Sequence, residues 1–154
     1  MKKFRQKIKV AIDSPAAAGA GTIAKAISKH FNLLYLDTGK IYRYIALLKL
    51  KNKKNFTYKF LKIKIKNLKL EDLNKKILSN DEIGIMASDL AKNFTIRKMV
   101  HSFQIKCAYY FPKKYNGSCL DGRDITYKII PDAEFKFFVT ANTKVRALRR
   151  FKEL

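Results

Sequence analysis

Apolar residues recur at two spacings along this chain, and the changes from one spacing to the other predict its elements. The β-branched run within Lys7–Ile12 predicts a first strand, and four consecutive apolar residues at Leu33–Leu36 predict a second. Between them, the segment from Ala20 to Phe31 repeats apolar side chains at helical spacing, which predicts a helix. One face of this helix carries Ile23, Ile27, His30 and Phe31.

A second helix is expected after the second strand, from about Lys40, with Ile41, Ile45 and Leu48 turned inward. Strand, helix, strand and helix thus follow one another at short spacing. This order is typical of a parallel sheet, so we expect an α/β fold in three layers, with helices flanking the sheet on both sides.

The pattern of the Lys-rich segment at residues 49–76 is less regular, and this segment is expected to form an insertion off the sheet. Apolar residues alternate with lysines from Lys59 to Leu68, which predicts an edge strand with its charges outward. A short helix is expected over Asp72–Ile77. The predicted single domain, residues 1–154, therefore has a core at about 7–50 and 84–154 and an inserted segment at about 51–83.

The rest of the chain predicts three more helices and two more strands. The first helix opens with the capping-box spacing of Ser79 and Glu82 and runs to about Ala91. The second helix is capped by Thr95; its inward face carries Ile96, Met99 or Val100, Phe103 and Cys107, and its opposite face carries Arg97, His101 and Gln104. The strands are expected at Ser118–Leu120 and Phe135–Thr140, and the last helix begins at about Thr143 with Arg146, Arg149 and Arg150 on one face.

Length and composition restrict the class of protein. The chain has 154 residues, 47% of them hydrophobic, and no apolar run approaches the ~18 residues of a membrane span. The basic start of the chain does not lead into a secretory signal, and Cys107 and Cys119 are too few for a disulfide framework. We therefore expect a monomeric cytoplasmic protein with two free thiols and no membrane partner.

The charge is strongly one-sided, with 34 Lys and Arg against 12 Asp and Glu, formally +22. A basic surface attracts phosphate backbones, so a nucleic-acid-binding protein is one reading. The other reading is compositional bias together with attraction of small phosphates, because the lysines accompany many Asn, Ile, Phe and Tyr, all of which have A/T-rich codons. No aromatic and basic pattern of an RNA-binding module is present, which favours the second reading.

A small-residue loop between the first strand and the first helix is the strongest chemical signal. The segment from Ser14 to Thr22 reads Ser-Pro-Ala-Ala-Ala-Gly-Ala-Gly-Thr. A strand, such a loop and a helix start form a cradle in which backbone N–H groups and the helix dipole face a phosphate. Against the pattern G-x-x-x-x-G-K-[ST], Ser14 takes the first glycine position, Gly19 keeps the second, and Ala20 replaces the lysine.

Several further segments, taken in order with this loop, resemble bacterial cytidylate kinases. The resemblance covers roughly residues 8–50 and 84–154. Its segments are Ala11–Thr22, Leu36–Arg43, Ala87–Ser88, Arg97 with Gln104, Asp121–Ile125, Pro131–Ala133 and Val145–Arg150. The resemblance implies a P-loop nucleoside monophosphate kinase fold and phosphoryl transfer from ATP to CMP or dCMP with Mg²⁺. Pyrimidine nucleotide metabolism is the implied setting.

The resemblance also implies roles for individual residues. Ser14, Pro15, Ala16, Ala17, Ala18, Gly19, Ala20, Gly21 and Thr22, with Arg146, would bind ATP. Thr38, Arg43, Ser88, Arg97, Gln104 and Asp124 would bind the acceptor nucleotide. Thr22, Arg43, Arg123, Asp124 and Arg150 would act in catalysis, and Thr22 would stand near Mg²⁺, with Asp37 or Asp121 orienting its waters. Arg149 is expected to be a surface residue or a residue that pairs with the helix dipole.

Three departures from the family pattern leave alternatives open. Ala20 stands in place of the P-loop lysine. The inserted segment is expected to be reduced, and the arginine-rich lid and the C-terminal end of the family are expected to be missing after Leu154. Another cation, such as a lid arginine, could take the place of the lysine. The chain is therefore expected to be a cytidylate kinase, with a non-catalytic nucleotide-binding remnant as the second hypothesis and a basic nucleic-acid-binding protein as the third.

Overall fold

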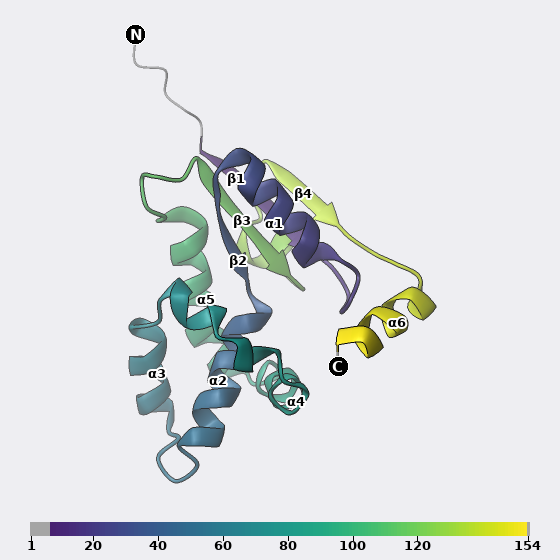
Figure 1. The fold of residues 1–154 in the computed structure, drawn as a ribbon. Coiled ribbons are helices and arrows are strands. Elements are labelled where there is room, and N and C mark those ends of the chain that lie inside the picture. The colour runs from purple at the N-terminus through teal and green to yellow at the C-terminus, as the bar shows by residue number, and fades with distance from the viewer. Residues whose placement is uncertain (1–6, 154) are drawn as a thin grey trace. The chain divides into compact units, whose positions relative to one another are not determined.

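A computed structural model describes residues 7–153 of the chain (Figure 1). The basic start of the chain, up to residue 6, and Leu154 lie outside the described residues. The contacts divide the chain into two units. A sheet unit comprises Met1–Asp37 and Ile105–Leu154, and a helical unit comprises Thr38–Gln104. Each is described by itself.

The sheet unit is built on four parallel strands in the order β2-β3-β1-β4 (Figure 1). The strands are β1 (Ile8–Asp13), β2 (Leu33–Asp37), β3 (Gly117–Gly122) and β4 (Phe135–Phe138). The register pairs Asp13 with Gly122 and Asp37 with Asp121. The predicted parallel sheet is confirmed, and its register brings three acidic strand ends to one edge.

Helix α1 (Ala20–Phe31) covers one face of the sheet and has the bounds that the sequence predicts. The predicted apolar face is wrong, because Ile23 and Phe31 are exposed and the buried positions are Ala20, Ala24 and Ser28. Small side chains let the helix approach the strands closely. The core there joins this helix to Val10, Ile12, Leu33 and Cys119.

The other face of the sheet meets the end of α5 (Phe94–Tyr109) and the π-helical turn η3 (Ile125–Ile129). The buried Ser118 hydroxyl of β3 donates to the Ala108 carbonyl at 2.8 Å. Successive residues of a strand point to opposite faces, so Ser118 and Cys119 pack against different helices. The sheet therefore has helical structure on both sides, as the α/β reading predicts.

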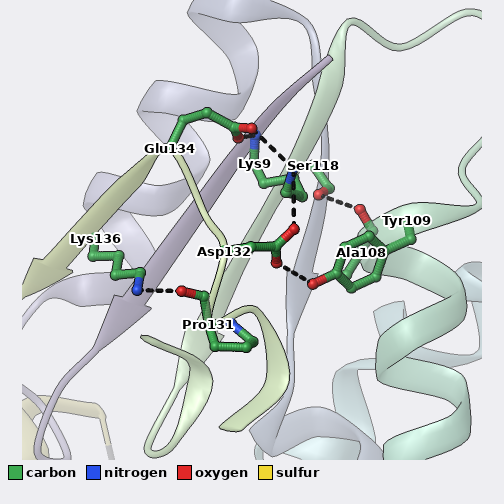
Figure 2. A network of polar contacts seen from close by, with 8 residues as sticks. All are labelled: Lys9, Ala108, Tyr109, Ser118, Pro131, Asp132, Glu134 and Lys136. Atoms are coloured by element: carbon green, nitrogen blue, oxygen red, sulfur yellow. Dashed lines mark hydrogen bonds and ion pairs between the residues drawn. The ribbon is translucent and has the colours of Figure 1, made fainter. Parts of the chain in front are cut away.

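Figure 2 shows how charged side chains connect β1 to the segment before β4. The Lys9 ammonium lies 2.9 Å from a Glu134 carboxylate oxygen and 3.6 Å from Asp132, and the Lys9 amide donates to Glu134 at 2.7 Å. The Tyr109 hydroxyl donates to Asp132, and Lys136 donates to the Pro131 carbonyl. The hydrogen bond with Glu134 raises the pKa of Lys9. These contacts tie the edge strand β4 and the end of α5 to the centre of the sheet.

The helical unit contains α2 (Gly39–Lys51), α3 (Tyr58–Lys66), the 3₁₀ turns η1 (Leu70–Asn74) and η2 (Lys76–Ser79), α4 (Asp81–Leu90) and the first turns of α5. The predicted edge strand at Lys59–Leu68 is wrong, since α3 is helical there. Leu61 and Ile65 are buried four residues apart, and the Thr57 hydroxyl accepts from the Phe60 amide at 3.2 Å. Burial of two large apolar side chains at helical spacing, together with the N-cap, therefore stabilises a helix here despite the alternation of lysines and apolar residues. The helix expected at Asp72–Ile77 is two 3₁₀ turns.

Two predicted helix caps are also wrong by one or two residues. Asn80, not Ser79, caps α4, since its side chain accepts from the amides of Glu82 and Ile83. Asn93, not Thr95, accepts from the Ile96 amide at 3.0 Å at the start of α5. The inward face of α5 is confirmed, with Ile96, Val100, Phe103 and Cys107 buried.

The C-terminal helix α6 (Thr143–Glu153) begins where the sequence predicts. All four residues of β4 are exposed, including Phe135, Phe137 and Phe138. Within residues 7–153, no helix combines the length and the apolar composition that crossing a membrane requires.

Candidate functional site

The loop between β1 and α1 has the geometry of an anion cradle. Ala17 and Gly19 have left-handed backbones, with φ of +57° and +96°. Left-handed residues beside right-handed ones turn successive N–H groups toward one side, which makes a concave site for an anion. The Ser14 amide donates to the Gly122 carbonyl at 3.0 Å, so the start of the loop is fixed to the end of β3.

Helix α1 begins directly after this loop. The amides of Thr22 and Ile23 close the first turn onto the Gly19 carbonyl, at 3.1 and 3.2 Å. The first turn carries no acidic side chain, so nothing there competes for the positive end of the helix dipole. Thr22 is exposed in this turn, with its hydroxyl one residue later than the usual pattern has it.

The buried carboxylate of Asp121 at the end of β3 lies beside the start of α1, and the half-buried Asp37 ends the neighbouring strand β2. A Cβ placed on Gly21 would lie 3.7 Å from Asp121 Oδ2 and 3.5 Å from the Tyr35 hydroxyl. Burial, together with the Asp37 carboxylate on the neighbouring strand, raises the pKa of Asp121 to about 7. Burial and the same two carboxylates also raise the pKa of Tyr35. A concentration of negative charge at this point is costly without a cation.

Arginines of α6 contact the loop carbonyls. Arg146 Nε donates to the Ala16 carbonyl at 2.8 Å, and Arg149 Nη1 donates to the Ala18 carbonyl at 2.9 Å and to Ala17 at 3.4 Å. Arg150 lies half-buried on the same helix. Arg149 is exposed, as the sequence predicts, and its guanidinium also contacts the loop, which the sequence did not predict.

The buried carboxylate of Asp13 organises the segment after β3. Its Oδ1 accepts from the Ile125 amide at 2.7 Å, and its Oδ2 accepts from the amide of Thr126 at 3.1 Å and from the Thr126 hydroxyl. Arg123 and Asp124 stand immediately before this turn, the first exposed and the second buried. Asp13 therefore determines where the Arg123–Asp124 pair begins its turn away from the sheet.

In the helical unit, Arg43 of α2 is held by backbone carbonyls of η2 and of Asn80, the N-cap of α4. Its Nη1 donates to the carbonyls of Leu78 and Asn80, at 2.8 and 3.1 Å. A Cβ on Gly84 would lie only 2.8 Å from Arg43 Nη2 and 3.1 Å from Cζ. Gly84 thus leaves the space that the guanidinium occupies against α4.

The other predicted acceptor residues of the helical unit lie on α2, α4 and α5. The Ser88 hydroxyl donates to the Gly84 carbonyl at 3.1 Å, and Arg97 Nη1 donates to the Ala91 carbonyl at 3.2 Å. Gln104 is buried, although the sequence places it on the polar face with Arg97 and His101. Thr38 occupies the N-cap position of α2 but its side chain makes no capping hydrogen bond.

The predicted residues therefore divide between the two units. The sheet unit holds the loop Ser14–Thr22, Asp37, Asp121, Arg123, Asp124, Arg146 and Arg150, which the structure gathers around the carboxyl edge of the sheet and α6. The helical unit holds Thr38, Arg43, Ser88, Arg97 and Gln104.

Four residues with a part in this geometry were not assigned to the site from sequence: Asp13, Tyr35, Gly84 and Arg149. An acidic residue ending the first strand, immediately before the loop, was a usable signal for Asp13. The contacts of Tyr35, Gly84 and Arg149 join segments that are distant in sequence, so no local pattern announces them.

Known proteins that are similar to this chain share one description. A family model described as cytidylate kinase matches residues 10–154. The chain is 43% identical over 152 residues to a cytidylate kinase of Bartonella tribocorum, with 94% of this chain and 66% of the relative covered. It is 36% identical to the cytidylate kinases of Mesomycoplasma hyopneumoniae and Clostridium botulinum. Each match covers 96% of this chain, and they cover 68% and 70% of those relatives. The chain thus spans about two thirds of the length of these curated relatives.

Proposed function

The chain belongs to the cytidylate kinase family, and on that premise we propose that it transfers the γ-phosphoryl group of ATP to CMP or dCMP, giving ADP and CDP or dCDP. The proposal places this reaction in the cytoplasm and in a monomer, with Mg²⁺ as the metal. It rests chiefly on the β1–α1 loop, a cradle of small residues with left-handed Ala17 and Gly19 at the start of α1.

The donor phosphates would bind at this loop, Ser14–Thr22. Small side chains allow phosphate oxygens to approach the main chain, and the backbone N–H groups and the helix dipole stabilise their charge. Arg146, which contacts the Ala16 carbonyl, would add a guanidinium at the rim of the same cradle, and Arg150 would act from the same helix.

The pair Asp37 and Asp121 is a suitable place for Mg²⁺. Among the described residues, no three His, Cys, Asp or Glu side chains gather as a metal site. Mg²⁺ typically takes one or two carboxylates and completes its shell with water and substrate phosphates, so two acidic strand ends beside the Thr22 turn suffice. When bound, the metal would neutralise charge on the phosphates, and the raised pKa of Asp121 reflects a carboxyl that a cation would stabilise in its ionised form.

The residues proposed for the acceptor nucleotide come from the helical unit, with Arg123 and Asp124 from the sheet unit. Arg43 and Arg123 are the cations proposed for the acceptor phosphate, because the planar guanidinium fork matches phosphate oxygens better than an ammonium does. Ser88 and Arg97 would contact the cytosine edge, and Thr38, Gln104 and Asp124 would place the nucleotide.

In the proposed reaction the protein itself forms no covalent bond with the substrates. An oxygen of the CMP phosphate attacks the γ-phosphorus, the bond to the β-phosphate bridging oxygen breaks, and ADP leaves with that electron pair. The catalytic contribution is to align donor and acceptor and to stabilise the charge that develops between them. Arg43, Arg123 and Arg150 are the side chains proposed for that stabilisation, with Thr22 and Asp124 orienting the reacting groups.

A coupled assay of ADP release with Mg·ATP and CMP tests the proposal, with isothermal calorimetry of each nucleotide beside it. We expect CMP-dependent turnover that UMP and AMP support more weakly. Nucleotide binding without turnover would favour the non-catalytic remnant. Absence of both binding and turnover in a folded sample would refute the proposal.

A further inference from the structure

The loop lacks a positive side chain at the position where its pattern has one. Ala20, at the lysine position, is buried against the core beneath α1, so this residue adds neither a charge nor reach toward a phosphate. The lysine of this pattern reaches the β- and γ-phosphates. A triphosphate at this loop would therefore lack the cation that normally accompanies the backbone amides.

A guanidinium from α6 stands at this same point of the loop. Arg149 Nη1 contacts the Ala17 and Ala18 carbonyls, and a Cβ on Gly19 would lie 3.2 Å from that nitrogen. Gly19 immediately precedes the lysine position. The Arg149 guanidinium therefore lies beside the residue that precedes position 20, although the two segments are about 130 residues apart in sequence.

We propose that Arg149 supplies the positive charge that position 20 lacks and that it binds the terminal phosphates of the donor nucleotide. This inference rests on the proposed binding of ATP at the loop. A guanidinium has five N–H donors in a planar fork, more than two carbonyls take up, so it can contact the loop and a phosphate together. Arg146, bonded to Ala16, keeps the helix that carries Arg149 against the loop.

Inorganic tripolyphosphate is the probe that isolates this role, because it carries the phosphates without the base or ribose. In calorimetry at fixed ionic strength, Arg149→Gln should weaken its binding about 10- to 100-fold, the worth of a charged hydrogen bond. Adenosine binding should not change. Lys152→Gln removes one positive charge from an exposed position of the same helix and is the matched control.

The second arm moves the charge back to its usual position. If Arg149 replaces the lysine, the pair Ala20→Lys with Arg149→Gln should recover most of the lost tripolyphosphate affinity, and Ala20→Lys alone should add little. Circular dichroism checks that these variants fold. Should Ala20→Lys not fold in the buried site, Arg149→Lys takes its place and should bind several-fold more tightly than Arg149→Gln.

The outcomes separate this inference from the proposed function. Wild-type turnover with Arg149→Gln indistinguishable from Lys152→Gln would overturn the role of Arg149 and leave the kinase proposal standing. Tripolyphosphate binding that depends on Arg149, in a protein that does not phosphorylate CMP, would support the role of Arg149 and refute the kinase proposal. Failure of the wild type to bind tripolyphosphate refutes the inference, as does an equal loss of tripolyphosphate and adenosine binding, which indicates a purely structural contact.

Discussion

Asp121 is a carboxyl whose pKa the fold raises into the neutral range. Its pKa is raised to about 7, first by burial and then by Asp37. The unfolded chain loses this proton near pH 4, so between about pH 4 and 7 the folded protein holds a proton that the unfolded one has released. Through this group, stability therefore falls as pH rises across that window, and it falls no further above pH 7.

This titration should be visible in metal binding. A protonated carboxyl is a poor magnesium ligand, so Mg²⁺ affinity should decrease as pH falls through 7, by about tenfold for each pH unit at most. Asp121→Asn should flatten that pH dependence and weaken Mg²⁺ binding at pH 8, as measured by titration of Mg²⁺ into the nucleotide-bound protein. An unchanged pH profile in Asp121→Asn would mean that Asp121 does not face the metal.

At the scale of elements, the η3 turn depends on a single carboxylate from another element. Asp13→Ala leaves the Ile125 and Thr126 amides without their acceptor, and each buried donor left unsatisfied costs ~1–3 kcal/mol. We expect the free energy of unfolding in urea to fall by about 3 kcal/mol. Turnover should fall as well, because the Arg123–Asp124 pair is released.

Thr126→Ala is the control for that change, since it removes only the hydroxyl donor and leaves both amides bonded to Asp13. Its cost in unfolding free energy should be about 1 kcal/mol. Equal losses in the two variants would show that the amide bonds of Asp13 contribute nothing to the turn.

Elements were predictable where one local signal dominates. The bounds of α1 follow from the loop before it and the apolar residues within it, and β1 to β3 follow from short apolar runs. The prediction of a strand at Lys59–Leu68 was wrong because the same alternating segment also places Leu61 and Ile65 at helical spacing. Burial of these two side chains favours the helix. The apolar face of α1 failed for the opposite reason, since close packing on a sheet selects Ala24 over Ile23.

The parts of the candidate site that consist of short continuous segments could be predicted from the sequence. The loop Ser14–Gly19 and the acidic ends of β2 and β3 were visible in sequence, because each is a local pattern at the end of a strand. The contacts of Arg149 with Ala18 and of Arg43 over Gly84 were not, since each is created by folding alone. The roles of the individual residues in binding and catalysis stay predictions.

At the scale of the whole molecule, the net charge of +22 favours attraction of any polyanion. If the charge is compositional and the specific ligands are nucleotides, binding of a homopolymer RNA should be strong near 10 mM salt. It should be lost by about 150 mM, since such binding falls steeply with salt as counterions are released. Binding of Mg·ATP, for which we propose directed contacts with the loop amides, should decline far less over the same range. Fluorescence anisotropy with labelled RNA and calorimetry with Mg·ATP, in the same buffers, measure both.

RNA binding that persists at about 150 mM salt and is unaffected by excess Mg·ATP and CMP would favour the nucleic-acid-binding alternative, because it would require a dedicated surface beyond the proposed nucleotide site.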